Sequence, residues 1–212
     1  PEGFEKFRPV LKKDEINYFK DVSPEKADLL RNRYRNAVYY EDHLIGRIIR
    51  GLKEKGLLKK TIVVITGDHG EEFYENGYLG HTSSFDDYQS RVVFVLWHPE
   101  AKPSVREDLT SHLDLVPTIM SSMGCQNPYG DYSQGISLLE KTDRPYIITA
   151  NWDTAAIIDS EYRIIFSTES YRNTFEVRTR EGYRFIKDSD RIIKERLLTL
   201  RTVLQRLSEF YR

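Results

Sequence analysis

The sequence predicts an α/β fold with a mostly parallel sheet flanked by helices. The first reason is a continuous β-branched segment, residues 61–66, directly after a long amphipathic helix, which is typical of a buried parallel strand. The second is a similar segment, residues 92–97, followed by Pro99. The third is a change of pattern after residue 150, where short strand-like pieces alternate with turns. We therefore expect an antiparallel β meander and an amphipathic helix after the α/β part.

The first helix is predicted to begin at Ser23, after an irregular segment that spans residues 1–22. Ser23 is a good N-cap, Pro24 suits the first turn, and Glu25 lies near the positive end of the helix dipole. Gly56 is placed to end the helix. One face carries an apolar stripe of Ala27, Leu30, Tyr34, Val38, Ile45, Ile48, Ile49 and Leu52.

A second helix is predicted within residues 109–124, ended by Gly124. Asp114 can cap it and Pro117 falls in its first turn. Ile119, Met120 and Met123 are expected to face the interior.

The C-terminal part is predicted as a meander followed by one helix. Strand-like pieces lie at residues 155–158, 163–167 and 174–178, and residues 146–149 are a further core strand candidate. The expected apolar stripe of the last helix is Ile193, Leu197, Leu200, Leu204, Leu207 and Tyr211. We assign residues 1–150 to the α/β core and residues 151–212 to the meander and helix, packed on the same globule.

Composition excludes several classes of function and structure but does not identify the function. The 212 residues carry 32 basic and 33 acidic side chains, a net charge of −1, which predicts neither a nucleic-acid surface nor a polybasic lipid anchor. Apolar segments are all shorter than the roughly 18–20 residues that a membrane-spanning helix needs. Cys125, the single cysteine, excludes an internal disulfide.

The densest polar cluster follows the strand at residues 61–66. In open α/β sheets, ligands bind beyond the carboxyl ends of the strands, where Asp68 and His69 are expected. A carboxylate and an imidazole on consecutive residues, flanked by Gly67 and Gly70, can turn toward one divalent cation. His81 can approach the same point from the far side of the loop.

Structural interpretations of these residues remain open. Asp68, His69 and His81 can simply satisfy loop hydrogen bonds in an α/β interaction domain without a metal. Glu71 and Glu72 are by default solvated acids, or else they orient His69 or the metal.

Other polar residues favour structural roles. Ser111, His112 and Asp114 suggest a catalytic triad, but adjacent polar residues at a helix start usually cap it. Cys125 has no neighbouring base in the sequence, which favours an inert thiol.

Several ordered blocks resemble the C-terminal part of the sulfatase and alkaline-phosphatase superfamily. They are residues 42–52 with the Asp-x-x-Ile-Gly step, residues 61–71 with Thr-Gly-Asp-His-Gly-Glu, Gly80-His81, residues 111–118 with the Pro-Thr helix, and residues 135–139. Residues 67–73 and 80–89 look most like membrane-anchored, extracytoplasmic sulfatase-like proteins, whose relatives include lipoteichoic-acid synthases and phosphoethanolamine transferases.

The resemblance implies an alkaline-phosphatase-like fold and a divalent metal bound by Asp68 and His69. His81 would contact a second metal or the anionic group of an ester substrate. The metal would be Zn or Mn if the transferases are the better guide, and Ca if the true sulfatases are. The location would be extracytoplasmic, periplasmic or at the cell surface, with a membrane tether upstream of these residues.

The family nucleophile has no counterpart in these blocks. Cys125 is followed by Gln-Asn-Pro and lacks the Cys-x-Pro-x-Arg pattern of sulfatase modification. Residues 1–9 are similar to a segment that follows an upstream family histidine, so we expect the nucleophile upstream and no catalytic nucleophile in this chain.

The sequence therefore predicts the C-terminal fragment of a metal-dependent sulfatase-like hydrolase, or of an enzyme that transfers a phospho-group. The alternative is a sulfatase-fold module without catalysis that acts as a lipid-binding or regulatory domain of a membrane protein.

Overall fold

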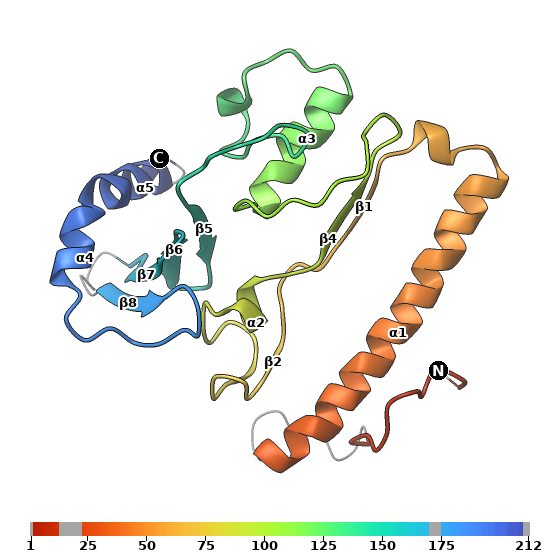
Figure 1. Ribbon diagram of the computed structural model, residues 1–212, viewed down its shortest axis with the longest axis horizontal. Coiled ribbons are helices and arrows are strands. Elements are labelled where there is room, and N and C mark those ends of the chain that lie inside the picture. The colour runs from red at the N-terminus through yellow and green to blue at the C-terminus, as the bar shows by residue number, and fades with distance from the viewer. Residues whose placement is uncertain (1, 13–22, 170–174, 210–212) are drawn as a thin grey trace. The chain divides into compact units, whose positions relative to one another are not determined.

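The computed structural model describes residues 2–12, 23–169 and 175–209 (Figure 1). It divides into two compact units, Pro1–Lys102 and Pro103–Arg212. This division falls earlier than the boundary predicted at residue 150, which stays a prediction. Within the described residues, none of the helices is both long and apolar enough to cross a bilayer.

The first unit consists of a long helix, two strand pairs and a short helix. Helix α1 spans Pro24–Glu54 and so begins where the sequence predicts, although Ser23 at the N-cap makes no side-chain capping hydrogen bond. Gly56 takes a left-handed φ of 69° just after the helix. Ala27 and Leu30 of α1 pack against Phe73, whereas Val38 and Ile48 are exposed, so the predicted stripe is buried only at its start. The remaining elements are η2 (Leu58–Lys60), β1 (Val63–Thr66), β2 (Glu72–Phe73), β3 (Leu79–Gly80), α2 (Asp87–Ser90) and β4 (Phe94–Trp97).

The two predicted core strands are present, but their pairing corrects the expectation of a parallel arrangement. β1 pairs with β4 in antiparallel register, with Val63 opposite Trp97 and Thr66 opposite Phe94. Parallel neighbours need a long crossover, usually a helix. The connection here instead consists of the β2–β3 hairpin and the four-residue α2, which return the chain beside β1 in the opposite direction.

The second unit contains the predicted meander. β5 (Ile147–Ala150), β6 (Thr154–Ile158), β7 (Tyr162–Ser167) and β8 (Phe175–Thr179) form an antiparallel sheet in that order, which confirms the expectation. Its core combines alternate strand residues with two residues of the last helix: Ala155, Ile157, Ile164, Phe166, Val177, Leu200 and Val203.

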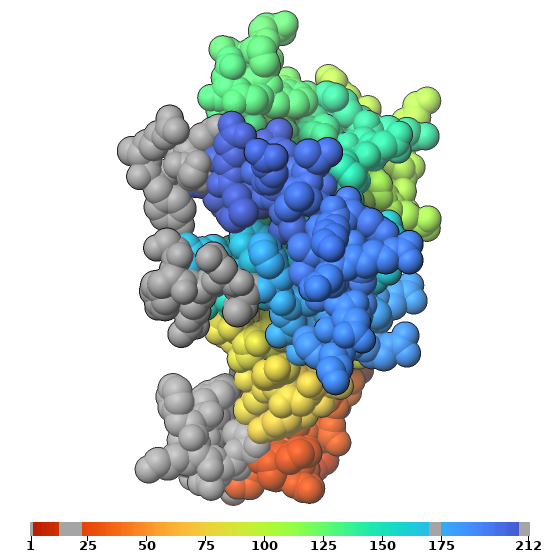
Figure 2. Space-filling model, turned by 90° about the vertical axis from the view of Figure 1, so that its left-hand side faces the viewer, coloured from red at the N-terminus to blue at the C-terminus, as the bar shows by residue number. Residues whose placement is uncertain are grey.

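The C-terminal helix is divided, which corrects the prediction of one continuous helix. α4 (Asp190–Glu195) and α5 (Leu197–Glu209) meet at Arg196, whose guanidinium donates to Asp159 and Glu161 at 2.7 Å each. Leu200, Val203 and Leu207 face the sheet, while Leu197 and Leu204 are exposed. Tyr211 lies outside the described residues. In the space-filling view, α4 and α5 (blue) form one surface beside the sheet (light blue and cyan) (Figure 2).

Helix α3 (Leu115–Ser122) follows a one-turn helix, η3 (His112–Asp114), and η4 (Tyr129–Asp131) lies beyond it. Ser111 and Asp114 form a capping box, so they serve as caps and not as a triad. Pro117 and Thr118 are the buried residues of α3, whereas Met123 is 76% exposed. The predicted inward face was therefore wrong for Met120 and Met123, whereas Ile119 is half-buried. Pro117 and Thr118 are covered instead, and Thr118 hydrogen-bonds to the loop before β5.

Asp114 holds this loop in place. Its carboxylate is 1% exposed, accepts from the N–H groups of Ser111 (2.8 Å) and Ile136 (2.9 Å), and pairs with Arg144. Thr118 adds a second link, since its hydroxyl accepts from the Leu138 N–H at 2.8 Å.

We predict that Asp114→Ala lowers the free energy of unfolding by about 3–5 kcal/mol, because removing one partner of a buried ion pair leaves the other charge unpaired. Chemical denaturation measures the change. Asp131→Ala, at the exposed end of η4, is the matched control and should change stability by less than about 0.5 kcal/mol. Equal effects of the two substitutions would contradict this assignment.

Candidate metal centre

The site is assembled by the β2–β3 hairpin beyond the end of β1. Thr66 ends β1, and Asp68 and His69 follow in the turn toward β2. Glu72 of β2 lies opposite Gly80 of β3. The next residues outward are Glu71 and His81, so the register itself brings them together.

Three side chains then form one cluster. Nδ1 of His81 lies 2.8 Å from a carboxylate oxygen of Glu71. The rings of His69 and His81 stack with centroids 3.9 Å apart and planes inclined by 29°. One donor atom from each of His69, Glu71 and His81 lies within 4.8 Å of the other two. The structure thus places both predicted histidines side by side, with the carboxylate of Glu71 hydrogen-bonded to His81.

His69 is oriented by its own backbone. Nδ1 lies 2.8 Å from the carbonyl oxygen of Gly70, and a carbonyl only accepts, so Nδ1 carries the proton and Nε2 keeps its lone pair. Nε2 lies 3.6 Å from Oδ2 of Asp68. Two ligands that each lie about 2.0–2.2 Å from a cation stand about this far apart. The pair therefore fits a shared metal ion.

Asp68 lies on the outer side of the cluster, with its side chain 89% exposed. Hydrogen bonds from the backbone N–H groups of His69 and of Asp68 itself, and then the neighbouring imidazoles, hold the pKa of the Asp68 carboxyl below its usual value. The ionised carboxylate is the form that binds a cation. The converging cluster itself consists of His69, Glu71 and His81, and Asp68 adjoins it through His69.

The backbone around His81 is unusual. Gly80 has a φ of 93°, and Thr82, on the other side of His81, has a φ of 68°. A non-glycine residue in the left-handed region costs about 1–3 kcal/mol and persists only where its surroundings hold it. The neighbours of this segment therefore fix the direction in which His81 points.

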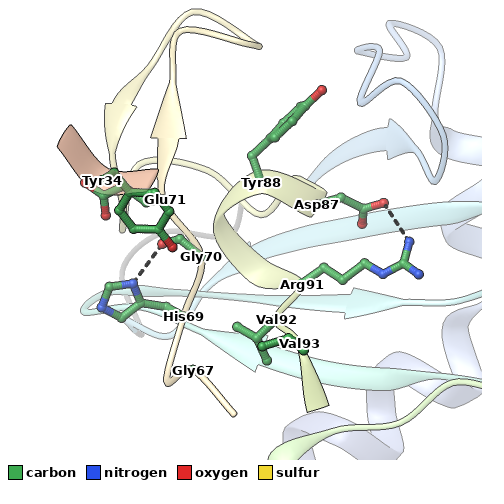
Figure 3. A pocket seen from close by; sticks show the side chains of 10 residues that line it. All are labelled: Tyr34, Gly67, His69, Gly70, Glu71, Asp87, Tyr88, Arg91, Val92 and Val93. Atoms are coloured by element: carbon green, nitrogen blue, oxygen red, sulfur yellow. Dashed lines mark hydrogen bonds and ion pairs between the residues drawn. The ribbon is translucent and has the colours of Figure 1, made fainter. Parts of the chain in front are cut away.

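A pocket of about 350 Å³ opens beside the cluster. Figure 3 shows His69 and Glu71 on one side of it and Asp87 with Arg91 on the other. Tyr34 of α1 and Tyr88 of α2 contribute phenol rings to the wall. Two members of the cluster, His69 and Glu71, therefore line a cavity with aromatic walls, and the Arg91–Asp87 ion pair closes its other side.

Behind the cluster lies a buried polar network that the sequence did not reveal. Glu72 is fully buried and accepts from the N–H groups of Asn76 (2.8 Å) and Tyr78 (2.9 Å). The amide of Gln89 donates to its other oxygen at 2.8 Å. Asp86 accepts from the Ser84 hydroxyl at 2.8 Å and from the Asn76 amide at 3.0 Å.

The pKa values of the two buried carboxyls, Glu72 and Asp86, shift in opposite directions. Burial, and then the hydrogen bond with Asp86, raise the pKa of Glu72. Burial alone would also raise the pKa of Asp86, but its hydrogen bonds with Glu72, Asn76 and Ser84 outweigh burial and lower it. Glu72 is therefore not the solvated acid that its position in the sequence favoured. Strand alternation was the available signal, since adjacent acids on a strand face opposite sides.

The comparisons with known proteins agree with this architecture. Residues 1–125 match the profile of the sulfatase family, and the chain belongs to that family. The lipoteichoic acid synthase-like protein YvgJ of Bacillus subtilis is 29% identical over 177 residues, which are 77% of this chain and 28% of YvgJ. The choline-sulfatase of Rhizobium meliloti is 28% identical over 62% of this chain and 25% of its own length. The inner membrane protein YejM of Salmonella typhimurium is 26% identical over 68% of this chain and 25% of its own.

Solved structures confirm the alkaline-phosphatase-like α/β class. The phosphonate monoester hydrolase SpPMH from Silicibacter pomeroyi superposes with a TM-score of 0.72 at 22% identity, over 91% of this chain and 44% of that one. The phosphonate monoester hydrolase of Agrobacterium radiobacter gives a TM-score of 0.70 at 18% identity, over 89% and 43%. The chain thus spans about a quarter of these sequence relatives and less than half of these structures.

Gly70 provides a test of how tightly the cluster is held. A Cβ at Gly70 would lie 1.9 Å from the carbonyl oxygen of Tyr88, so the segment that carries His69 and Glu71 must shift. We predict that Gly70→Ala lowers the free energy of unfolding by about 1–3 kcal/mol, measured by denaturation. Gly51→Ala, in α1 with open space around it, is the control and should be neutral or stabilising. An unchanged stability of Gly70→Ala would show that this contact is not made.

Proposed function

We propose that this chain is the metal-binding part of a sulfatase-family enzyme that hydrolyses sulfate or phosphate esters, or transfers a phospho-group. The observation that carries the proposal is the convergence of His69, Glu71 and His81 within 4.8 Å, just beyond β1. Family membership supports the reaction class. The nucleophile is proposed to lie in the part of the family domain that these residues do not match.

Asp68 and His69 would hold the cation, with Zn or Mn preferred over Ca because of the imidazole donors. A divalent cation at this position neutralises ester oxygens and lowers the pKa of a bound hydroxyl. Glu71 orients His81 through the 2.8 Å contact at Nδ1, which leaves Nε2 of His81 to bind the anionic group or to protonate the leaving oxygen.

We propose that the pocket beside the cluster takes the ester substrate. Tyr34 and Tyr88 contribute flat walls, His69 and Glu71 line the same space, and the Arg91 guanidinium lies at its edge, 4.0 Å from the carboxylate of Asp87. The relative YejM is an inner membrane protein, which supports a membrane tether in the whole protein, and the resemblance of residues 67–73 and 80–89 to extracytoplasmic sulfatase-like proteins supports that location. We propose both features for this protein.

We expect the purified chain to bind about one equivalent of Zn²⁺ or Mn²⁺ in isothermal titration calorimetry. Asp68→Ala and His69→Ala should each lower the affinity at least about 10–100-fold, because each removes a ligand. His98→Ala is the matched control, since His98 follows β4 and accepts from the Glu100 N–H at 3.2 Å. Absence of site-dependent metal binding in the wild type would exclude the proposed enzyme.

In the enzyme that contains this chain, His81→Ala should lower kcat on an aryl phosphate or aryl sulfate by about 10²–10⁴-fold, the usual contribution of a general acid. Glu71→Gln should have a smaller effect, because the imidazole remains. His98→Ala again serves as control. Normal turnover by His81→Ala would remove His81 from the mechanism, and an inactive wild type with bound metal would favour the alternative of a binding module.

A further inference from the structure

Gln89 lies at the centre of the polar network behind the cluster. It belongs to α2, its side chain is buried with 4% of the residue exposed, and its N–H donates to Oδ1 of the N-cap residue Asp86 at 3.0 Å. A buried amide that cannot reach water must find its partners in the protein.

These partners come from the two backbone segments that carry the cluster. The side-chain oxygen accepts from the N–H groups of Ser83 (3.0 Å) and Ser84 (3.1 Å), just beyond His81 and Thr82. The side-chain nitrogen donates to Glu72, next to Glu71. The backbone carbonyl of Gln89 accepts from the N–H of Gly70, between His69 and Glu71, at 2.9 Å. One residue therefore connects both sides of the cluster.

The connection matters because the segment after His81 is strained. Thr82 has a φ of 68°, and the two N–H groups held by Gln89 directly follow it. Loss of the amide would leave those groups and one oxygen of Glu72 without this partner in a buried region, and the strained turn would relax. A shift of about 0.5 Å is enough to spoil a metal or catalytic geometry.

We propose that Gln89 is a positioning residue that sets the separation between His81 and the segment carrying His69 and Glu71. This inference rests on the metal site proposed above. It states that the metal affinity of the site depends on the side chain of Gln89, which does not touch the metal.

The amide of Gln89 has one donor end and one acceptor end, so the inference can be tested by exchanging the amide and the carboxylate between positions 89 and 72. Its oxygen faces two N–H donors and its nitrogen faces a carboxylate, so Gln89→Glu would set two carboxylates against each other. Adding Glu72→Gln reverses the donor and acceptor across this contact. The new amide at position 72 can still accept from Asn76 and Tyr78, while the new carboxylate at position 89 still accepts from Ser83 and Ser84.

The experiment compares the wild-type chain with Gln89→Ala, Gln89→Glu and the double exchange Glu72→Gln/Gln89→Glu. Thr118→Val is the matched control, because Thr118 is also a buried polar side chain that accepts from a loop N–H, but in the second unit. Two readouts are taken: the affinity for Zn²⁺ and Mn²⁺ by calorimetry, and the nuclear Overhauser effect between the rings of His69 and His81. Circular dichroism checks that each variant folds.

We expect Gln89→Ala and Gln89→Glu to lower metal affinity by about 10–100-fold and to weaken the ring-to-ring signal. The double exchange should recover both to within about threefold of the wild type, and Thr118→Val should change neither. If Gln89→Ala fails to fold, the comparison of Gln89→Glu with the double exchange decides whether Gln89 has the positioning role. A folded Gln89→Glu with wild-type affinity and ring signal, or a double exchange no better than Gln89→Glu, would overturn the inference.

The two proposals fail in different ways. A wild type that binds no metal contradicts the proposed function. The ring-to-ring signal, compared between the wild type and the Gln89 variants, then still tests the positioning role. A wild type that binds metal with unchanged affinity in both Gln89 variants contradicts the positioning role alone.

Discussion

The pairing of Glu72–Phe73 with Leu79–Gly80 is the contact on which the site depends. It determines that Glu71 and His81 are neighbours and that Glu72, one residue later, faces the interior. A slip of one residue would reverse both faces, placing Glu72 at the cluster and burying Glu71. The metal donors and the buried network are therefore two consequences of a single register.

A pairing of two residues on each strand is too short to be stable alone. The polar network compensates, because each carboxylate oxygen of Glu72 accepts hydrogen bonds from residues beyond the ladder. Burial and the hydrogen bond with Asp86 raise the pKa of Glu72, whereas the hydrogen bonds of Asp86 lower its pKa despite burial. The hydrogen bonds to both carboxyls offset part of the cost of burying them.

The sequence predicted those parts of the fold that depend on local pattern. The start of α1, the two core strand segments and the antiparallel meander follow from capping residues and apolar periodicity, and all are present. Pairing direction and buried faces were predicted less well, since these depend on packing between distant segments. Met123 illustrates this: its helical position indicated the interior, but hydrogen bonds of Asp114 and Thr118 decide which side of α3 is covered.

The candidate site shows the same division. Asp68, His69 and His81 could be selected from residue type and position after a strand, and the structure brings both histidines together. Glu71 was selected only as a residue that could orient His69 or the metal, and its contact with His81 follows from the hairpin register. Gln89 was not selected, because its role arises from a side chain that contacts two segments distant from it in the fold, at Glu72 and at Ser83–Ser84.

The relatives constrain the reaction class more than the substrate. A lipoteichoic acid synthase-like protein and a choline-sulfatase are similar to this chain at 29% and 28% identity, so identity does not separate phosphate from sulfate chemistry. A cation held by the cluster, as proposed above, would suit an anionic ester of either kind, because it neutralises oxygens that sulfate and phosphate share. Selectivity in the proposed enzyme would then come from residues that contact the rest of the substrate. Tyr34, Tyr88 and Arg91 are the residues we propose for this role, because they line the pocket next to His69 and Glu71.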